Sequence, residues 1–158
     1  MPSILFVCLA NRFRSPLAAA FFQQCLKNAA DGASWSVSSA GTWTQNDLPV
    51  DSRAIQDAIF WGVDIKNHRS RQVNAKILSD NDLILVMEAG QKEALRIEFS
   101  RESRKIFLVS EISDGSAYDI PDPFGPNEVS HQEIAAELHS LIERGFSKIC
   151  NWALGSEK

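Results

Sequence analysis

The longest apolar run in the chain, residues 4–10 (ILFVCLA), is followed almost at once by a helix start. Ser15 suits the N-cap of that helix, and Pro16 suits its first turn, where proline gives up no hydrogen bond. An apolar strand that turns directly into a helix is typical of a parallel sheet covered by helices on both faces. Because the run is far shorter than the ~20 residues that span a bilayer and no cationic segment precedes it, we expect neither a membrane span nor a signal peptide.

Helical patterns alternate with four short runs that resemble strands. We expect strands at Ile4–Cys8, Trp35–Ser39, Asp82–Met87 and Lys105–Val109. We expect helices at Ser15–Lys27, Ser52–Trp61, Gln72–Leu78 and Ala89–Glu98, and a last helix that begins at a capping box formed by Ser130 and Glu133. The alternation predicts an α/β three-layer sandwich with a four-stranded parallel sheet and about five helices. No linker, repeat or low-complexity tract divides residues 1–158, so we expect a single domain.

Charge and cysteine content narrow the functional class. Sixteen Lys and Arg against 20 Asp and Glu leave a net charge of −4, so the chain lacks the basic excess that binds nucleic acid or a membrane surface. The three cysteines, Cys8, Cys25 and Cys150, are odd in number and far apart. That pattern argues against a disulfide framework and for a reducing compartment, so we expect a cytoplasmic protein. No Cys, His or Asp cluster has ligand spacing, so we expect no metal and no cofactor.

Two loops are candidates for the functional site. In parallel α/β sheets the ligand lies beyond the carboxyl ends of the strands, and the loop Asn11–Arg14 directly follows the first strand. The stretch Ser110–Val129 contains three prolines and two glycines and shows no helical or strand period. We therefore expect a long structureless loop there, of the kind that is usually functional in a compact domain.

Cys8 and Arg14 lie at the two ends of the first loop. The backbone N–H groups of a loop that enters a helix N-terminus converge on one point, which is a ready phosphate site. A thiolate at that point is stabilised by the amides and by Arg14, which makes it a nucleophile near neutral pH. The planar fork of Arg14 can also bind two phosphoryl oxygens. The plain alternative is a buried cysteine that acts as a small hydrophobe beside a solvated arginine.

Residues 7–16, VCLANRFRSP, closely resemble the signature of the low-molecular-weight protein tyrosine phosphatases. In that family a strand-end cysteine, an asparagine and an Arg-Ser-Pro form the phosphate loop. Other segments resemble the family in the same order: S-A-G-T at 39–42, H-R-S-R-Q at 68–72, the third strand at Asp82–Glu88, and D-I-P-D-P-F-G at 119–125. The resemblance is to bacterial members. It implies the strand order 2-1-3-4 and a hydrolase of phosphotyrosine and small aryl phosphates that forms a cysteinyl-phosphate intermediate.

The resemblance also implies the catalytic roles. By position, Cys8 is the nucleophile, Arg14 binds the phosphoryl group, and Asp122 is the general acid and base. The residues implied to surround the phosphate are Leu9, Ala10, Asn11, Arg12, Phe13 and Arg14. Asp122 has independent support, because an aryl ester needs a proton donor opposite the nucleophile and Asp122 lies between two stiffening prolines in the long loop. Asp119 is the rival donor, but it lacks the following proline and matches no acid of the family.

Residues outside this trio resemble supporting parts of the family's site. Those implied to hold the phosphate loop in shape are Asn11, Ser15, Ser39 and His68. Asparagine suits a tight loop because it tolerates left-handed backbone. We expect Arg12, Trp43 and Phe124 at the rim of the substrate pocket.

The sequence departs from the family at three loop positions. Ala10 stands where glycine is usual, Arg12 replaces an aliphatic residue of the pocket, and Phe13 replaces a second cysteine. Arg12 therefore bears on substrate preference. Phe13 bears on redox control, because the thiol that would trap an oxidised Cys8 as a disulfide is missing.

The implied partner is a phosphotyrosine-containing protein, and we expect a monomer. Three alternatives remain open. One is a catalytically impaired module that binds phosphate or a partner. A phosphoarginine phosphatase on the same fold is another, although Arg12 would repel a guanidinium. The third is a thiol-dependent arsenate reductase, which needs additional cysteines close to the nucleophile.

Overall fold

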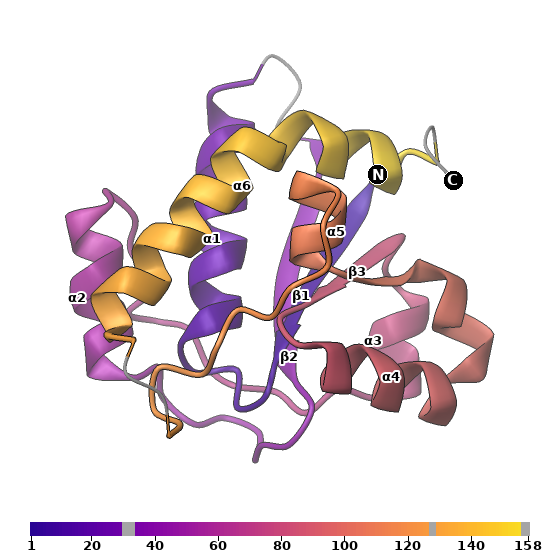
Figure 1. Cartoon of the computed structure of the whole chain (residues 1–158), viewed down its shortest axis with the longest axis horizontal. Coiled ribbons are helices and arrows are strands. Elements are labelled where there is room, and N and C mark those ends of the chain that lie inside the picture. Colours follow the sequence, from indigo (N-terminus) through magenta and orange to yellow (C-terminus); the bar gives the residue numbers. More distant parts are fainter. Residues whose placement is uncertain (30–33, 127–128, 156–158) are drawn as a thin grey trace.

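The computed structural model describes residues 1–29, 34–126 and 129–155, which form a three-layer α/β sandwich (Figure 1). The strands are β1 (Ser3–Cys8), β2 (Ser36–Gly41), β3 (Leu83–Val86) and β4 (Ile106–Leu108). The α-helices are α1 (Arg14–Lys27), α2 (Ser52–Phe60), α3 (Ala75–Ser79), α4 (Ala89–Glu98), α5 (Val109–Asp114) and α6 (His131–Ala153). A short 3₁₀-helix, η2 (Ser100–Lys105), leads into β4.

The four strands form one parallel sheet in the order β2-β1-β3-β4, which confirms the predicted class and order. Strand β1 is central and buried along its whole length. Its last residue, Cys8, pairs with Gly41 at the end of β2. Because all strands run the same way, their carboxyl ends meet at one edge of the sheet, where the phosphate loop also lies.

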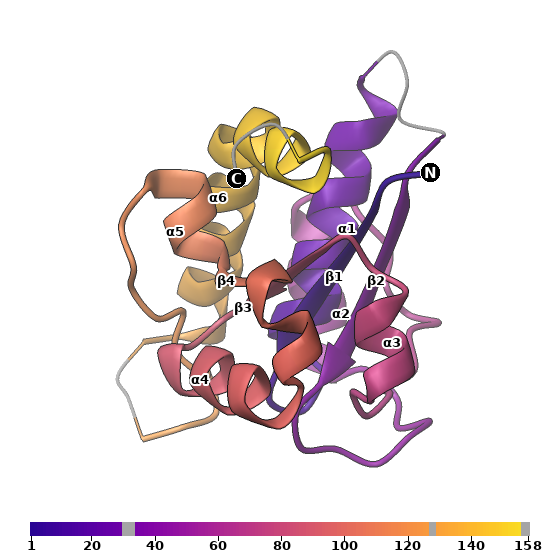
Figure 2. The same ribbon diagram turned by 90° about the vertical axis from the view of Figure 1, so that its right-hand side faces the viewer.

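Alternate residues of β1 face two separate hydrophobic cores, as the two-residue period of a strand requires. Ile4 and Phe6 pack in the larger core, with side chains from α1, α5 and α6. Leu5 and Val7 pack in the smaller core on the other face, which includes residues of α3 and α4. Figure 1 shows α1 and α6 on one side of the sheet and α3 and α4 on the other, and Figure 2 looks onto the sheet from the side of α3 and α4.

The start of α1 differs from the prediction. The N-cap is Phe13 rather than Ser15, and no side chain caps this end. Ser15 lies inside the first turn, where its hydroxyl contacts Cys8 and Asn11 instead. For the last helix the predicted N-cap is confirmed, because the Ser130 side chain accepts a hydrogen bond from the Glu133 amide before α6 begins.

The prediction of a structureless stretch after the fourth strand is wrong at its start. Helix α5 occupies its first residues, and Val109 and Ile112 are buried there. Six residues are too few to show a helical period, so the sequence pattern missed it. Residues 127 and 128 of this stretch lie outside the described residues.

Two other boundaries shift by two residues or more. Helix α3 begins only at Ala75, because the side chain of Asn74 caps it by accepting from the Ile77 amide. Strand β2 runs two residues further than predicted, to Gly41. Within the described residues, no helix is long and apolar enough to cross a membrane.

Candidate active site

The loop between β1 and α1 is held tightly against the end of β2. The amides of Thr42 and Trp43 donate to the carbonyls of Cys8 and Leu9, both at 2.9 Å. A Cβ on Gly41 would lie only 2.7 Å from the Leu9 carbonyl oxygen, so the close approach requires glycine. The S-A-G-T segment therefore packs directly against the loop.

Asn11 is the point where this loop turns back. Its φ is 59°, in the left-handed region that asparagine tolerates better than most residues. The turn aims the Asn11 amide at Cys8, and its N–H donates to Cys8 Sγ at 3.3 Å. On the other side, Ser15 Oγ lies 3.0 Å from the same sulfur. The sulfur therefore lies at the N-terminus of α1, within hydrogen-bond distance of the Asn11 amide and the Ser15 hydroxyl.

The buried side chain of Asn11 joins the predicted supporting residues into one network. Its Nδ2 donates to Ser15 Oγ at 2.8 Å and to Ser39 Oγ at 2.9 Å. Its Oδ1 accepts the backbone N–H of Arg71 at 3.0 Å, a contact that the sequence did not reveal. His68 Nε2 lies 2.8 Å from the Asn11 carbonyl oxygen and therefore donates to it. Burial lowers the pKa of His68, which favours its neutral form.

Arg14 is 3 % exposed and has two partners from distant parts of the chain. Its Nη1 forms an ion pair with Glu88 and donates to the Ile120 carbonyl at 2.8 Å. Glu88 is not among the residues predicted from the sequence, although it comes directly after the third predicted strand, at the carboxyl edge of the sheet. These two contacts fix the position of the guanidinium.

Cys8, Arg14 and Asp122 line one small cavity of about 90 Å³. The other residues that line it are Leu9, Ala10, Arg12, Phe13, Asp51 and Phe124. The structure thus brings the three predicted catalytic side chains together. Asp119 is engaged elsewhere, because its Oδ1 accepts the Ala89 amide at the start of α4 at 2.8 Å.

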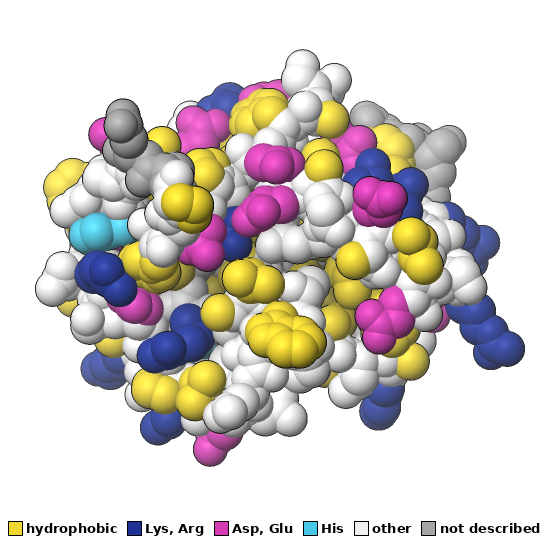
Figure 3. All heavy atoms as spheres, turned by 60° about the horizontal axis from the view of Figure 1, so that its bottom comes forward, with side chains coloured by type: hydrophobic (Ala, Val, Ile, Leu, Met, Phe, Trp, Pro, Cys, Tyr) yellow, Lys and Arg dark blue, Asp and Glu magenta, His cyan; other side chains and the backbone are white. Residues whose placement is uncertain are grey.

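The three predicted rim residues divide between two hollows. Phe124 lines the cavity, whereas Trp43, 81 % exposed, lines an adjacent groove of about 690 Å³. Arg12 borders both, and its Nε donates to the Pro49 carbonyl at 2.8 Å. Figure 3 shows the molecule from the side of the strands' carboxyl ends, where hydrophobic side chains are exposed among interspersed acidic and basic ones. Trp43 therefore lines the groove beside the cavity rather than the cavity that contains Cys8.

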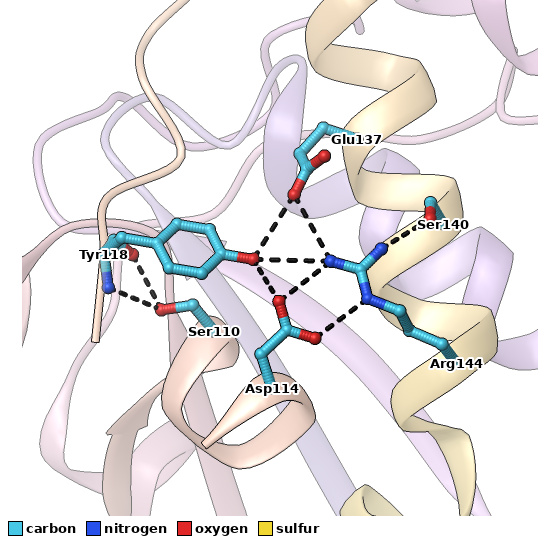
Figure 4. A network of polar contacts seen from close by, with 6 residues as sticks. All are labelled: Ser110, Asp114, Tyr118, Glu137, Ser140 and Arg144. Atoms are coloured by element: carbon cyan, nitrogen blue, oxygen red, sulfur yellow. Dashed lines mark hydrogen bonds and ion pairs between the residues drawn. The ribbon is translucent and has the colours of Figure 1, made fainter. Parts of the chain in front are cut away.

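A second polar network anchors the chain just before the Asp122 loop (Figure 4). Ser110 Oγ donates to the Tyr118 carbonyl and accepts its N–H. The Tyr118 hydroxyl donates to Asp114, whose carboxylate also accepts from Arg144 of α6 at 2.8 Å. The hydrogen bond from Arg144 is the main cause that lowers the pKa of Asp114 to about 2. The segment that leads to residues 119–122 is thereby tied to both α5 and α6.

The motifs at the cavity correspond to a known family model. The model for low molecular weight phosphotyrosine protein phosphatases matches residues 3–151. The chain belongs to this family. Family membership makes it a hydrolase of the protein tyrosine phosphatase type, as the sequence motifs predicted.

Relatives in the family carry two different names. The chain is 32 % identical over 143 residues to EpsP of Ralstonia nicotianae, a probable low molecular weight protein-tyrosine-phosphatase, with 90 % of each chain covered. It is 30 % identical over 141 residues to a protein-arginine-phosphatase of Bacillus subtilis, covering 89 % of this chain and 92 % of the relative. Both therefore match along almost their whole length.

Solved structures of the family share the fold. The crystal structure of a YwlE mutant from Bacillus subtilis aligns with a TM-score of 0.85 at 27 % identity, covering 95 % of this chain and 99 % of that one. A low molecular weight protein tyrosine phosphatase from T. tengcongensis aligns with a TM-score of 0.84 at 30 % identity, covering 94 % of this chain and 99 % of that one.

Within the described part of the phosphatase chain, no group of three or more His, Cys, Asp and Glu side chains could hold a metal ion.

Proposed function

We propose that the protein hydrolyses phosphotyrosine in proteins, with Cys8 as nucleophile, Arg14 as phosphate-binding residue and Asp122 as general acid and base. The observation that carries the proposal is that all three side chains line one cavity at the carboxyl end of β1. Cys8 has the hydrogen-bond surroundings of a thiolate, and Arg14 is fixed beside it by Glu88 and the Ile120 carbonyl.

The first step transfers the phosphoryl group to sulfur. The Cys8 thiolate attacks phosphorus, an S–P bond forms, and the bond from phosphorus to the phenolic oxygen breaks. Asp122, protonated at this stage, gives its proton to that oxygen, so that phenol rather than phenolate leaves. The loop amides and the guanidinium of Arg14 bind the equatorial phosphoryl oxygens, whose charge they stabilise in the transition state.

The second step returns the enzyme to its starting state. Asp122, now a carboxylate, takes a proton from a water molecule as this water attacks phosphorus. The S–P bond breaks, and inorganic phosphate and the Cys8 thiolate form. Ser15 Oγ, 3.0 Å from the sulfur, can donate to the departing thiolate and so make it a better leaving group.

The cavity walls favour an aromatic ester. Leu9, Phe13 and Phe124 supply apolar surface around the entrance to Cys8. A phosphotyrosine ring can lie against such walls while its phosphate reaches the loop, whereas the shorter phosphoserine side chain leaves them uncovered. We place the enzyme in the cytoplasm, because all three of its cysteines are free and the mechanism needs a reduced cysteine. We also expect it to act as a monomer.

Phosphoarginine is the second substrate that the comparisons raise, because one relative is a protein-arginine-phosphatase. Two features of the cavity bear on it. The Asp51 carboxylate, which could attract a guanidinium, is already paired with Arg53 at 3.0 Å. Arg12, on the same wall, would repel a second guanidinium. The charges therefore favour phosphotyrosine.

A panel of phosphopeptides of one sequence tests the proposal. The peptides carry phosphotyrosine, phosphoserine or phosphoarginine at the same position, and phosphate release gives kcat/KM for each. We expect phosphotyrosine to be preferred. A preference for phosphoarginine would assign the protein to the alternative activity. Phosphate binding without turnover of any peptide would make it a binding module, and reduction of arsenate would make it an arsenate reductase.

A further inference from the structure

The ring of Phe124, which lines the cavity that contains Cys8, contacts two other side chains. The Phe13 ring meets it edge to face, with centroids 5.4 Å apart and planes at 86°. The Arg53 guanidinium carbon lies 3.9 Å from the ring centroid. Both arrangements are attractive, the first between ring edge and face and the second between cation and π-system. We call these three residues the acid-loop clamp.

The cation of the clamp is itself fixed to the phosphate loop. Arg53 donates through Nε and Nη2 to the two carboxylate oxygens of Asp51, both at 3.0 Å. The Asp51 amide in turn donates to the Arg12 carbonyl at 3.0 Å. The fork-to-fork pair sets the orientation of the guanidinium plane. The position of the Arg53 guanidinium beside the Phe124 ring is therefore fixed, through Asp51, by the phosphate loop.

The other partner, Phe13, belongs to the phosphate loop and is buried. Its ring also meets the His131 ring, with centroids 6.1 Å apart, at the start of α6. His131 Nδ1 lies 2.7 Å from a carboxylate oxygen of Asp57 in α2. Phe13, which stands where the family has a second cysteine, thus gives Phe124 a rigid face to pack against.

The backbone transmits the position of Phe124 to Asp122. The Phe124 amide donates to Asp122 Oδ1 at 2.9 Å, and the Gly125 amide donates to the Asp122 carbonyl at 3.1 Å. Upstream, Ile120 is buried, and its amide donates to the Met87 carbonyl at 2.8 Å. The short segment that carries Asp122 therefore has one anchor at Ile120 and the other at the Phe124 ring.

We infer that Arg53 is a positioning residue for the general acid: through the acid-loop clamp it holds the Asp122 carboxyl over Cys8. This inference rests on the proposed function. Without the clamp, the downstream end of the loop is free to move, and Asp122 spends less time within reach of the leaving oxygen. The rate then falls most for substrates whose leaving group most needs a proton.

The test compares kcat/KM for a poor and a good leaving group, phenyl phosphate and para-nitrophenyl phosphate. Arg53→Met removes the cation but keeps an unbranched side chain, and Arg53→Lys keeps the charge. Arg101→Met is the matched control, because Arg101 is exposed in η2, which leads into the opposite end of the parallel sheet. A second pair of variants carries Asp122→Ala, with and without Arg53→Met.

We expect Arg53→Met to lower kcat/KM for phenyl phosphate by about two- to fivefold, the range of an exposed cation–π contact. The loss for para-nitrophenyl phosphate should be smaller, Arg53→Lys should recover part of the activity, and Arg101→Met should behave as wild type. Competitive inhibition by inorganic phosphate should not change. In the Asp122→Ala background, Arg53→Met should cause no further loss, since the residue that it positions is gone.

Equal losses on both substrates, a parallel weakening of phosphate inhibition or an additive loss in the Asp122→Ala background would overturn the inference. Weaker phosphate inhibition would show that Arg53 acts on the substrate anion directly, and either of the other two results would show that it does not act through Asp122. An Arg53→Met variant indistinguishable from Arg101→Met would overturn it as well. In all these cases the wild-type enzyme is active and the proposed function stands, whereas an inactive wild type would refute both.

Discussion

The guanidinium of Arg14 donates a 2.8 Å hydrogen bond to the carbonyl of Ile120. Arg14 ends the phosphate loop, and Ile120 is two residues before Asp122, so one contact joins the phosphoryl site to the segment that carries the acid. The buried Ile120 side chain and the network around Tyr118 hold that segment from behind. Asp122 and the proposed phosphate site are therefore positioned as one unit.

Replacement of Asp122 tests its assignment as the acid. Asp122→Ala should lower kcat/KM for phenyl phosphate by roughly 10²–10⁴-fold, the usual contribution of general acid–base catalysis. The loss should shrink for para-nitrophenyl phosphate, because a more acidic phenol leaves without help. Asp119→Asn is the control and should affect folding stability more than rate, since Asp119 binds the start of α4. A loss that does not depend on the leaving group would place the acid elsewhere.

Arg12 should set the preference for residues around the phosphotyrosine. It borders both the catalytic cavity and the groove that contains Trp43. A cation there favours peptides with acidic flanking residues, and the preference should fade as salt rises. The measurement is kcat/KM for acidic and neutral phosphotyrosyl peptides at low and high salt, for wild type, Arg12→Ile and the distant control Arg101→Ile. An unchanged preference in Arg12→Ile would show that its side chain does not read the substrate.

The fold and part of the site could be predicted because their signals are local. Apolar strands that alternate with helical patterns define the sheet, and the C-x5-R loop at the end of β1 places Cys8 and Arg14. The supporting residues Asn11, Ser15 and Ser39 followed from family resemblance, and the structure joins them by hydrogen bonds. These features depend on neighbours in the chain or on a recognisable motif.

The parts that sequence missed depend on contacts between distant segments. Glu88 pairs with Arg14 across 74 residues of chain, and nothing in its local sequence marks that partner. The same holds for Arg53 over the Phe124 ring. For Ser15 only the prediction of a helix cap is wrong, because Phe13 takes the N-cap position. In the structure its hydroxyl is directed to the Cys8 sulfur.

Peroxide should inactivate the enzyme without forming an internal disulfide. Phe13 supplies no thiol, and Cys25 is more than three turns along α1 from the phosphate loop, in a groove beside Trp61 and His139. A disulfide needs Cα atoms within about 7 Å, so we expect sulfinic or sulfonic Cys8 to accumulate, with little recovery in thiol reductants and slower damage when phosphate is bound. Intact-mass analysis after brief exposure decides the point. Loss of two hydrogens, reversed by reductant, with Cys8 linked to Cys25 or Cys150, would show the opposite.

The network around Tyr118 should stabilise the fold in a pH-dependent way. Arg144 and then Tyr118 are the main groups that lower the pKa of Asp114 from 3.8 to about 2. Because the folded pKa is below the unfolded one, the stabilisation is complete above the unfolded pKa and is lost as the pH falls toward 2. Tyr118→Phe removes one hydrogen bond and should lower the free energy of unfolding by about 1 kcal/mol at neutral pH.

Urea unfolding of wild type and Tyr118→Phe from neutral to acid pH measures this difference. It should narrow below pH 3.8, as Asp114 takes up a proton in both proteins. A difference that stays constant down to the lowest pH would show that the Tyr118 hydroxyl does not act through the Asp114 carboxylate.

The most direct test of the mechanism is capture of phosphate on the nucleophile. Wild type and Cys8→Ser are mixed with para-nitrophenyl phosphate, quenched in acid within one turnover and analysed by intact mass and peptide mapping. We predict one phosphoryl group on Cys8 of the wild type. Cys8→Ser should show no turnover but should still bind inorganic phosphate, because the loop amides and Arg14 remain. Steady turnover by Cys8→Ser, or a phosphoryl group on any residue other than Cys8 in the wild type, would contradict the cysteinyl-phosphate mechanism.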